Sequence, residues 1–296
     1  MRPQVFDFQA YVAQHKDPEA RARAMSFGEY AYRGDIKALR TLHAFMPVRM
    51  MLSAGLQLWA GWGRQAVLTQ STKASEKEGA RVHRAALEAA QALHMPPVQV
   101  FLSHQLKDAS AHALGDREEV FVAVHTELPK LLDDRSLLFE LGRQFGHIQN
   151  AHVVYRTVYY YADELANVVL RWVAKPAVMA IQHWRKRATL TADRAGLLAC
   201  RELDVAIRRM AQQAISTRRL EEDLKLEDVL EALRKDPGAP PFGEKVGAGR
   251  LPLHLRVAAL RAFSQSQFYL EHIASYAEKG KSLSAVDDEL DAMLRG

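Results

Sequence analysis

Cysteine is nearly absent from this sequence, since Cys200 is the only one in 296 residues. An internal disulfide framework is therefore excluded, and this usage fits a reducing compartment. Cys200 ends an apolar run, which indicates a small core residue rather than a nucleophile. The sequence also lacks a basic start followed by a continuous apolar segment, so we expect no secretory signal and a cytoplasmic location.

Long hydrophobic runs are lacking too. A membrane-spanning helix needs about 20 apolar residues, and the best candidate, residues 50–63, is bounded by Arg49 and Arg64. A second candidate, residues 153–184, contains several charged residues. Both are expected to be buried or interfacial helices. The first, with Trp59 and Trp62 at one end, could instead lie peripherally on a membrane surface or in a partner groove.

The charge is modest, at +5, and the 48% hydrophobic content is enough to bury a sizeable core. A basic cluster at residues 183–187 is typical of a solvated helix end. Because no nucleic-acid-binding motif accompanies it, no nucleic-acid partner is expected.

The hydrophobic patterning predicts a fold that is predominantly helical. Polar segments at residues 71–79 and 236–249 suggest boundaries. We therefore expect an N-terminal helical extension at 1–79, a core at 80–235, and a flexible loop with C-terminal helices packing on the core at 236–296.

The most informative segment, residues 137–152, reads LLFELGRQFGHIQNAH. In zinc peptidases the motif H-E-x-x-H places two histidine ligands one helical turn apart, with a glutamate as general base beside the first. Here the corresponding positions hold Arg143, Gln144 and His147. The surrounding glycines and apolar residues of such a helix are retained.

These residues and their flanks resemble the HtpX-like and prenyl-protein-protease-type gluzincin zinc metallopeptidases. Residues 189–196, TLTADRAG, match that family's E-x-x-A-D-R-x-G helix, and residues 251–260 match its segment near the C-terminus. The resemblance covers roughly residues 81–270 and implies a predominantly helical α+β fold: a zincin-like core with a small sheet. The stretches at residues 98–102 and 119–124 resemble the family's two core strands. It also implies that Thr189 occupies the third ligand position and that Asp193 matches the acid that orients a ligand histidine.

The sequence departs from the family pattern at the zinc-ligand and general-base positions. A hydrolytic zinc needs three protein ligands and an open position for water, whereas only His147 of those three remains. Arg143 is cationic and has no lone pair to donate, and Gln144 cannot take a proton from water. Thr189 offers only a neutral hydroxyl. The sequence therefore predicts no catalytic residue and no bound metal, and a pseudo-peptidase.

Arg143 is a candidate replacement for the metal's charge. Glu140 lies three residues before it, a spacing that allows an ion pair on a helix, and Asp193 is a second candidate partner. The alternative is an ordinary surface cation. On the same helix His152 would project about 140° from His147, so these two histidines are not expected to share one ion.

Three functions remain open. The first is a binding, scaffolding or regulatory protein that holds a polypeptide or pairs with an active relative. In gluzincins the substrate adds a strand to the sheet, and here we expect that edge strand to comprise Val120, Phe121, Val122, Ala123 and Val124. The second is an active zinc metalloendopeptidase with an atypical site, and the third a structural partner that uses its N-terminal helices.

Overall fold

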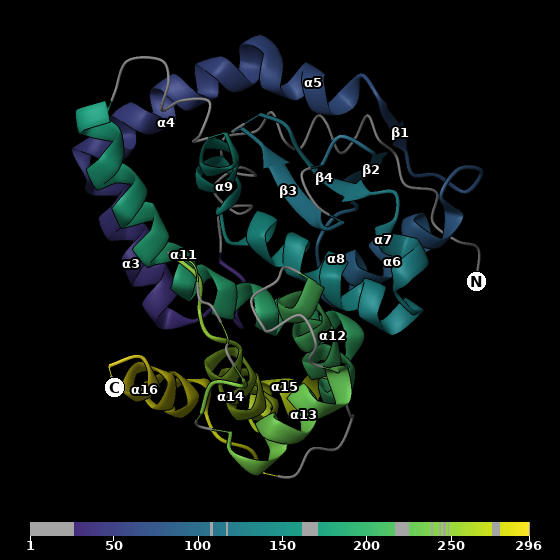
Figure 1. The fold of residues 1–296 in the computed structure, drawn as a ribbon, viewed down its shortest axis with the longest axis vertical. Helices are drawn as coiled ribbons and strands as arrows, with labels where there is room; N and C mark the ends of the chain where they lie inside the picture. The colour runs from purple at the N-terminus through teal and green to yellow at the C-terminus, as the bar shows by residue number, and fades with distance from the viewer. Residues whose placement is uncertain are drawn as a thin grey trace.

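The computed structural model describes residues 27–106, 109–116, 118–161, 171–216, 225–237, 239–242, 244, 247, 249–273 and 279–295. These residues are mostly helical, with one small sheet (Figure 1). The elements are α3 (Arg33–Ala44), α4 (Met46–Leu58), the π-helix η1 (Trp59–Gly63), α5 (Arg64–Leu68), β1 (Ser71–Lys73), α6 (Ala80–Ala92), β2 (Gln99–Ser103), β3 (Ala111–Gly115), β4 (Val120–His125), α7 (Leu128–Leu131), α8 (Asp134–Gln149), α9 (Val153–Tyr160), α11 (Arg171–Cys200), α12 (Leu203–Ser216), α13 (Leu226–Lys235), α14 (Leu253–Ser264), α15 (Gln267–Ile273) and α16 (Leu283–Met293).

The four strands lie in the order β1-β2-β4-β3. Strand β4 pairs in parallel with β2 and antiparallel with β3. It is therefore an interior strand, and the prediction that Val120, Phe121, Val122, Ala123 and Val124 form the sheet edge is wrong. The edges of the described sheet are β1 and β3, neither of which was predicted as a strand.

Both faces of the sheet are covered by helices. Phe121 and Ala123 pack with Trp59 of η1 on one face, whereas Val122 and Val124 join the main core with α6 and α8. Successive side chains of a strand point to opposite faces, so the continuous hydrophobic run of β4 fits a strand that is buried on both sides.

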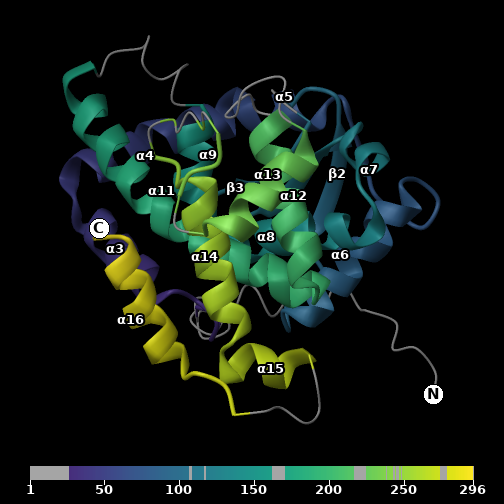
Figure 2. The same ribbon diagram turned by 60° about the horizontal axis from the view of Figure 1, so that its bottom comes forward.

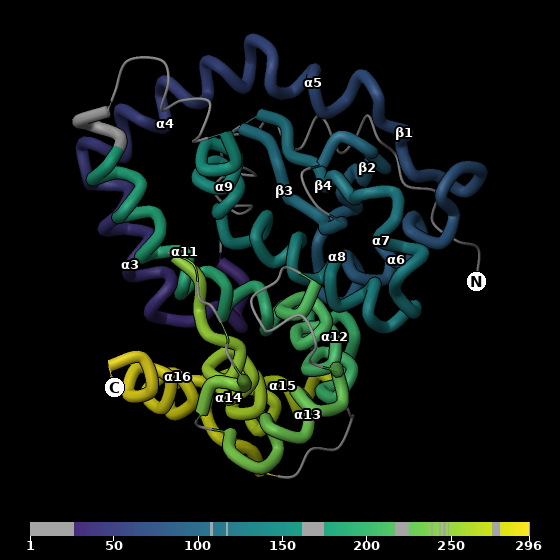
Figure 3. The backbone as a smooth tube through the Cα atoms, viewed as in Figure 1, coloured from purple at the N-terminus to yellow at the C-terminus, as the bar shows by residue number. Residues whose placement is uncertain are grey.

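Helix α8 is the centre of the molecule and packs against α11. Two glycines permit the close approach: a Cβ on Gly142 would lie 2.5 Å from the Cβ of Ala199, and one on Gly146 would lie 2.4 Å from that of Ala195. Asp133 caps α8 by accepting a hydrogen bond from the backbone N–H of Ser136 at 2.7 Å. In Figure 3 the long α11 runs from the upper left into the centre of the molecule.

Residues near both ends of the described chain meet beside this core. Arg33 at the start of α3 forms an ion pair with Asp288 of α16 at 2.7 Å, and Arg194 of α11 forms one with Asp287 at 2.6 Å. Figure 2 shows α16 beside α3. The N-terminal and C-terminal helices are thus joined by ion pairs, while the predicted boundaries at 79 and 235 stay a prediction.

The helices expected from the hydrophobic periodicity are present at α6, α12, α13, α14 and α16. The pair Gly34-Asp35 predicts a break between two helices, but both residues lie within α3, so this prediction is wrong. The segment Asp17-Pro18-Glu19 predicts the start of another helix, which lies largely outside the described residues. Among the described residues, no helix is both long and apolar enough to cross a membrane.

Candidate functional site

The residues singled out in the peptidase-like motif are carried by two helices in contact. Glu140, Arg143, Gln144 and His147 lie on α8, and all are buried. Asp193 is buried on α11, one turn after Thr189. The tight packing of α8 against α11 brings the two groups together, as the resemblance implied.

A guanidinium–carboxylate cluster connects these helices to α12 and α14. Arg143 Nε donates to Asp193 Oδ1 at 2.8 Å, and its Nη1 lies 3.5 Å from Glu140 Oε2. Arg256 holds both oxygens of Asp193 at 2.8 Å, and Arg209 Nε lies 3.1 Å from Glu140 Oε1. The pairing predicted for Arg143 is therefore present, and the solvent-exposed alternative is wrong.

The charges in this cluster determine its protonation. Burial acts to raise the pKa of Glu140, but the positive charges of Arg209 and Arg143 outweigh it, so that pKa is lowered. Burial acts in the opposite sense on Arg256, where the neighbouring Asp193 carboxylate prevails and raises the guanidinium pKa. Glu140 and Arg256 are therefore ionised at neutral pH.

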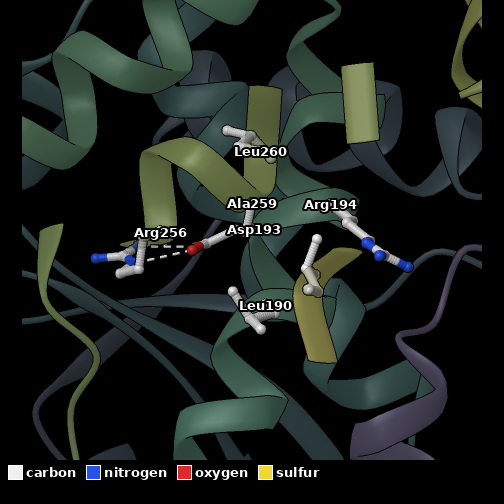
Figure 4. A pocket seen from close by; sticks show the side chains of 7 residues that line it. Leu190, Asp193, Arg194, Arg256, Ala259 and Leu260 are labelled. Atoms are coloured by element: carbon white, nitrogen blue, oxygen red, sulfur yellow. Dashed lines mark hydrogen bonds and ion pairs between the residues drawn. The ribbon is translucent and has the colours of Figure 1, made fainter. Parts of the chain in front are cut away.

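Figure 4 shows Asp193 directed toward Arg256, while Arg194, its neighbour in sequence, points the other way. Arg194 reaches the backbone oxygen of Tyr30 and Asp287 instead. The narrow space between these side chains leaves no room for a water molecule. Asp193 and Arg194 thus hold α11 to different parts of the fold.

His147 contacts a cation that the sequence did not single out. Arg156 of α9 donates from Nη1 to His147 Nε2 at 2.9 Å. Burial, followed by the charge of Arg156, holds the pKa of His147 well below its usual range. Burial and the charges of Arg185 and Arg143 lower the pKa of Arg156 to about 9, which leaves it cationic at neutral pH.

His152 lies beside His147, with 3.0 Å between their Nδ1 atoms. The prediction that these side chains diverge is wrong because α8 ends at Gln149. Ala151 then adopts a positive φ of 58° and redirects the chain. The angular spacing of a continuous helix therefore does not apply to His152.

These residues and Asp35 form a chain of contacts, Arg156–His147–His152–Asp35, which we call the histidine chain. Its hydrogen bonds, from Arg156 to His147 and from His147 to His152, have a fixed direction. Arginine can only donate, so His147 accepts at Nε2 and carries its proton on Nδ1. His152 consequently accepts at Nδ1 and carries its proton on Nε2, which lies 3.0 Å from Asp35 Oδ2 but makes no hydrogen bond with it. Asp35 is buried and accepts from Trp184 Nε1 at 2.8 Å and Thr191 Oγ1 at 2.6 Å.

Gln144, at the general-base position, is bound to the edge strand. Its Oε1 accepts from the backbone N–H of Ala113 at 3.1 Å, and Arg156 Nη2 lies 3.4 Å from the same oxygen. Thr157 of α9 accepts similarly from the N–H of Gly115 at 2.9 Å. These two outward N–H groups of β3 are therefore occupied within the chain, and α9 packs on this strand.

Thr189 does not enter the cluster, because its hydroxyl donates to the backbone oxygen of Arg185 within α11 at 2.9 Å. Of the three inherited ligand positions only His147 offers a metal-binding atom, and its Nε2 already accepts from Arg156. Among the described residues no three histidine, cysteine or carboxylate side chains gather as a metal site. The residues present do not fit a hydrolytic zinc.

One of the comparisons with known proteins gave a match. The searches of curated proteins and of solved structures gave no significant match. A family model described as Peptidase family M48 matches residues 76–237, which include the peptidase-like motif on α8 and Asp193 on α11. The chain belongs to peptidase family M48.

Proposed function

We propose that this M48 member is a pseudo-peptidase: a binding, scaffolding or regulatory protein that uses no metal and cleaves no peptide bond. The observation that carries the proposal is the bond from Arg156 to Nε2 of His147 at 2.9 Å. A guanidinium is a permanent cation without a lone pair at neutral pH, so it repels a metal ion from the remaining ligand.

The second support is the neutralisation of the inherited carboxylates. A buried carboxylate needs a cation or several hydrogen bonds. Asp193 has Arg143 and Arg256, and Glu140 has Arg209 and Arg143. No dication is required to balance this pair, because guanidinium groups already do so.

The third support is the covered edge of the sheet. A peptide that adds a strand needs free backbone donors and acceptors, and Gln144 and Thr157 occupy the N–H groups of Ala113 and Gly115. We propose that a partner, an active relative included, binds on another surface of the protein.

The proposal is tested by a cleavage assay on casein, an unstructured protein substrate, with and without a chelator. The wild-type protein leaves the substrate intact under both conditions. Cleavage by the purified protein that chelation abolishes would contradict the proposal and support an active metalloendopeptidase with an atypical site.

Two variants distinguish the effect of the missing zinc ligands from the effect of the Arg156 charge. The triple variant Arg143→His, Gln144→Glu, Thr189→Glu restores the residue types of the family, yet Arg156 still donates to His147. Adding Arg156→Gln removes this cation and raises zinc affinity at least about tenfold over the triple variant. Equal zinc affinity of the two folded variants would show that Arg156 does not oppose the metal.

A further inference from the structure

Exposed apolar side chains gather where α3 meets α4. Phe45 is 40% exposed, Met46 60% and Met50 45%. Phe45 is the extended residue between the two helices, and Pro47 in the first turn of α4 fixes the change of direction. Met46 and Met50 are one helical turn apart and lie side by side. We call these residues, with Arg40 and Arg49, the α3–α4 corner.

The corner lies on the outside of the molecule. Figure 1 shows α3 rising at the left, with the N-terminal part of α11 beside it, and α4 and α5 running along the top edge. The opposite side of α4 is buried: Val48, Met51 and Leu52 belong to a core cluster with Trp184 of α11. The α4 helix is thus apolar on two sides, only one of which is covered by described residues.

The stretch of chain that carries the corner has basic residues but no acidic ones. Residues 36–75 contain no aspartate or glutamate but include Lys37, Arg40, Arg49, Arg64 and Lys73. Arg64 pairs with Glu119 at 2.7 Å. Arg40 and Arg49 are exposed and flank the corner. Farther along the same edge, Trp62 of η1 is 43% exposed.

We propose that the α3–α4 corner docks on the surface of an anionic lipid bilayer. Large apolar side chains on one helix face, with arginines beside them, bind at the boundary of headgroups and acyl chains. A second copy of this chain fits the surface poorly, because a symmetric contact would place arginines against arginines.

The test is cosedimentation of the full chain with vesicles. One set contains phosphatidylcholine alone, and the other contains about 30% phosphatidylserine. The protein binds the anionic vesicles, and binding falls at least about tenfold when the salt is raised to about 0.5 M, where charges are screened beyond roughly 4 Å. Failure of the wild-type chain to bind anionic vesicles overturns the proposal.

Two variants locate the surface. Met46→Glu/Met50→Glu and Arg40→Glu/Arg49→Glu each lower the partition coefficient at least tenfold. The matched control is Leu131→Glu on α7, an apolar residue that is 68% exposed elsewhere, and it binds as the wild type does. Circular dichroism of each variant is the control for folding. If Met46→Glu/Met50→Glu unfolds, Met46→Ser/Met50→Ser is measured in its place.

Three results would overturn this assignment. They are wild-type binding by the folded corner variants, an equal loss in the Leu131→Glu control, and a concentration-dependent dimer that the corner variants abolish. The last result would assign the corner to self-association instead.

Discussion

Asp193 is the residue on which most of the buried charge converges. Its two oxygens accept from Arg143 and Arg256, and each of those guanidinium groups is at least nine-tenths buried. Removing one partner of a buried ion pair costs far more than removing both, because the remaining charge is left without compensation. Removal of Asp193 therefore leaves a buried cation unpaired, whereas removal of Arg143 leaves each buried carboxylate with another arginine.

Asp193→Ala is expected to destabilise the protein more than Arg143→Ala. The first variant leaves Arg256 without its carboxylate, at a cost of about 4 kcal/mol. The second leaves Asp193 with Arg256 and Glu140 with Arg209, so only a charge-assisted bond is lost, at about 2 kcal/mol. Urea unfolding of both variants gives the two free energies of unfolding.

A surface variant serves as the control for this comparison. Arg135 pairs with Glu202 at 3.1 Å and is 48% exposed, so Arg135→Ala is expected to cost under about 0.5 kcal/mol. If Arg143→Ala costs as much as Asp193→Ala, Arg143 is the only effective partner of the buried carboxylates.

His147 is expected to make the folded state less stable in mild acid. An unfolded chain protonates its histidines near pH 6.5, whereas burial and Arg156 hold the pKa of His147 well below that value. Below about pH 6.5 the unfolded state thus binds more protons. Stability then falls with falling pH, at up to about 1.4 kcal/mol per pH unit from this group.

In the variant His147→Gln the amide oxygen can still accept a hydrogen bond from Arg156, but the side chain does not titrate. The free energy of unfolding of this variant, measured by urea between pH 8 and pH 5, is expected to fall less steeply than that of the wild type. His183, His254 and His272 also have lowered pKa values, but they contribute equally to both proteins. Equal slopes would mean that His147 is not held neutral by its surroundings.

At the scale of elements, the sequence predicted what local periodicity controls. The peptidase-like motif predicted α8, and the three-residue separation of Glu140 and Arg143 predicted their contact. The order of the strands was not predictable in the same way. Strands β2 and β4 are neighbours in the sheet and pair in parallel, although β3 lies between them in the sequence. Strand β3, with the sequence AHALG, lacks the β-branched residues that signal a strand.

The contact between His147 and His152 was missed for a related reason. A helix end is usually signalled by glycine in the left-handed conformation, but here Ala151 adopts it. Without that signal, residues 137–155 read as one helix. That single helix would place Arg156 on a continuation of α8, away from His147. In the structure Arg156 lies on α9, a separate helix, and its side chain contacts His147. Asp35 was missed because it lies far away in the sequence.

The α8–α11 contact depends on the absence of a side chain at Gly146. A Cβ there would meet the Cβ of Ala195 at 2.4 Å, so Gly146→Ala is expected to cost about 1–3 kcal/mol through overpacking. Ala195→Gly alone costs about 1 kcal/mol, because glycine weakens a helix interior. In the double variant the new space accommodates the new methyl group.

A double-mutant cycle tests this contact. The double variant is expected to lose at least about 1 kcal/mol less than the sum of the single variants. Additivity within about 0.3 kcal/mol would show that the helices separate to admit the methyl group, and that Gly146 does not set their distance.

At the scale of the whole molecule, the N-terminal residues are part of the peptidase-like core. Asp35 of α3 contacts Trp184 and Thr191 of α11 and lies beside His152. The histidine chain therefore connects α3 through the former ligand His147 to α9. The same buried groups that would orient a metal-binding histidine in an active enzyme here join three helices. Under the proposed function, these contacts take the place of the family's metal centre and serve to hold the fold together.

The most direct measurement of that claim is the zinc content of the purified full-length protein by elemental analysis, after growth in medium that contains zinc. Arg156 and Arg143 place two cations at the former centre. We therefore predict well under about one-tenth of an equivalent of zinc per chain, and a melting temperature that a chelator leaves unchanged. About one equivalent of zinc, with a lower melting temperature after chelation, would contradict the account.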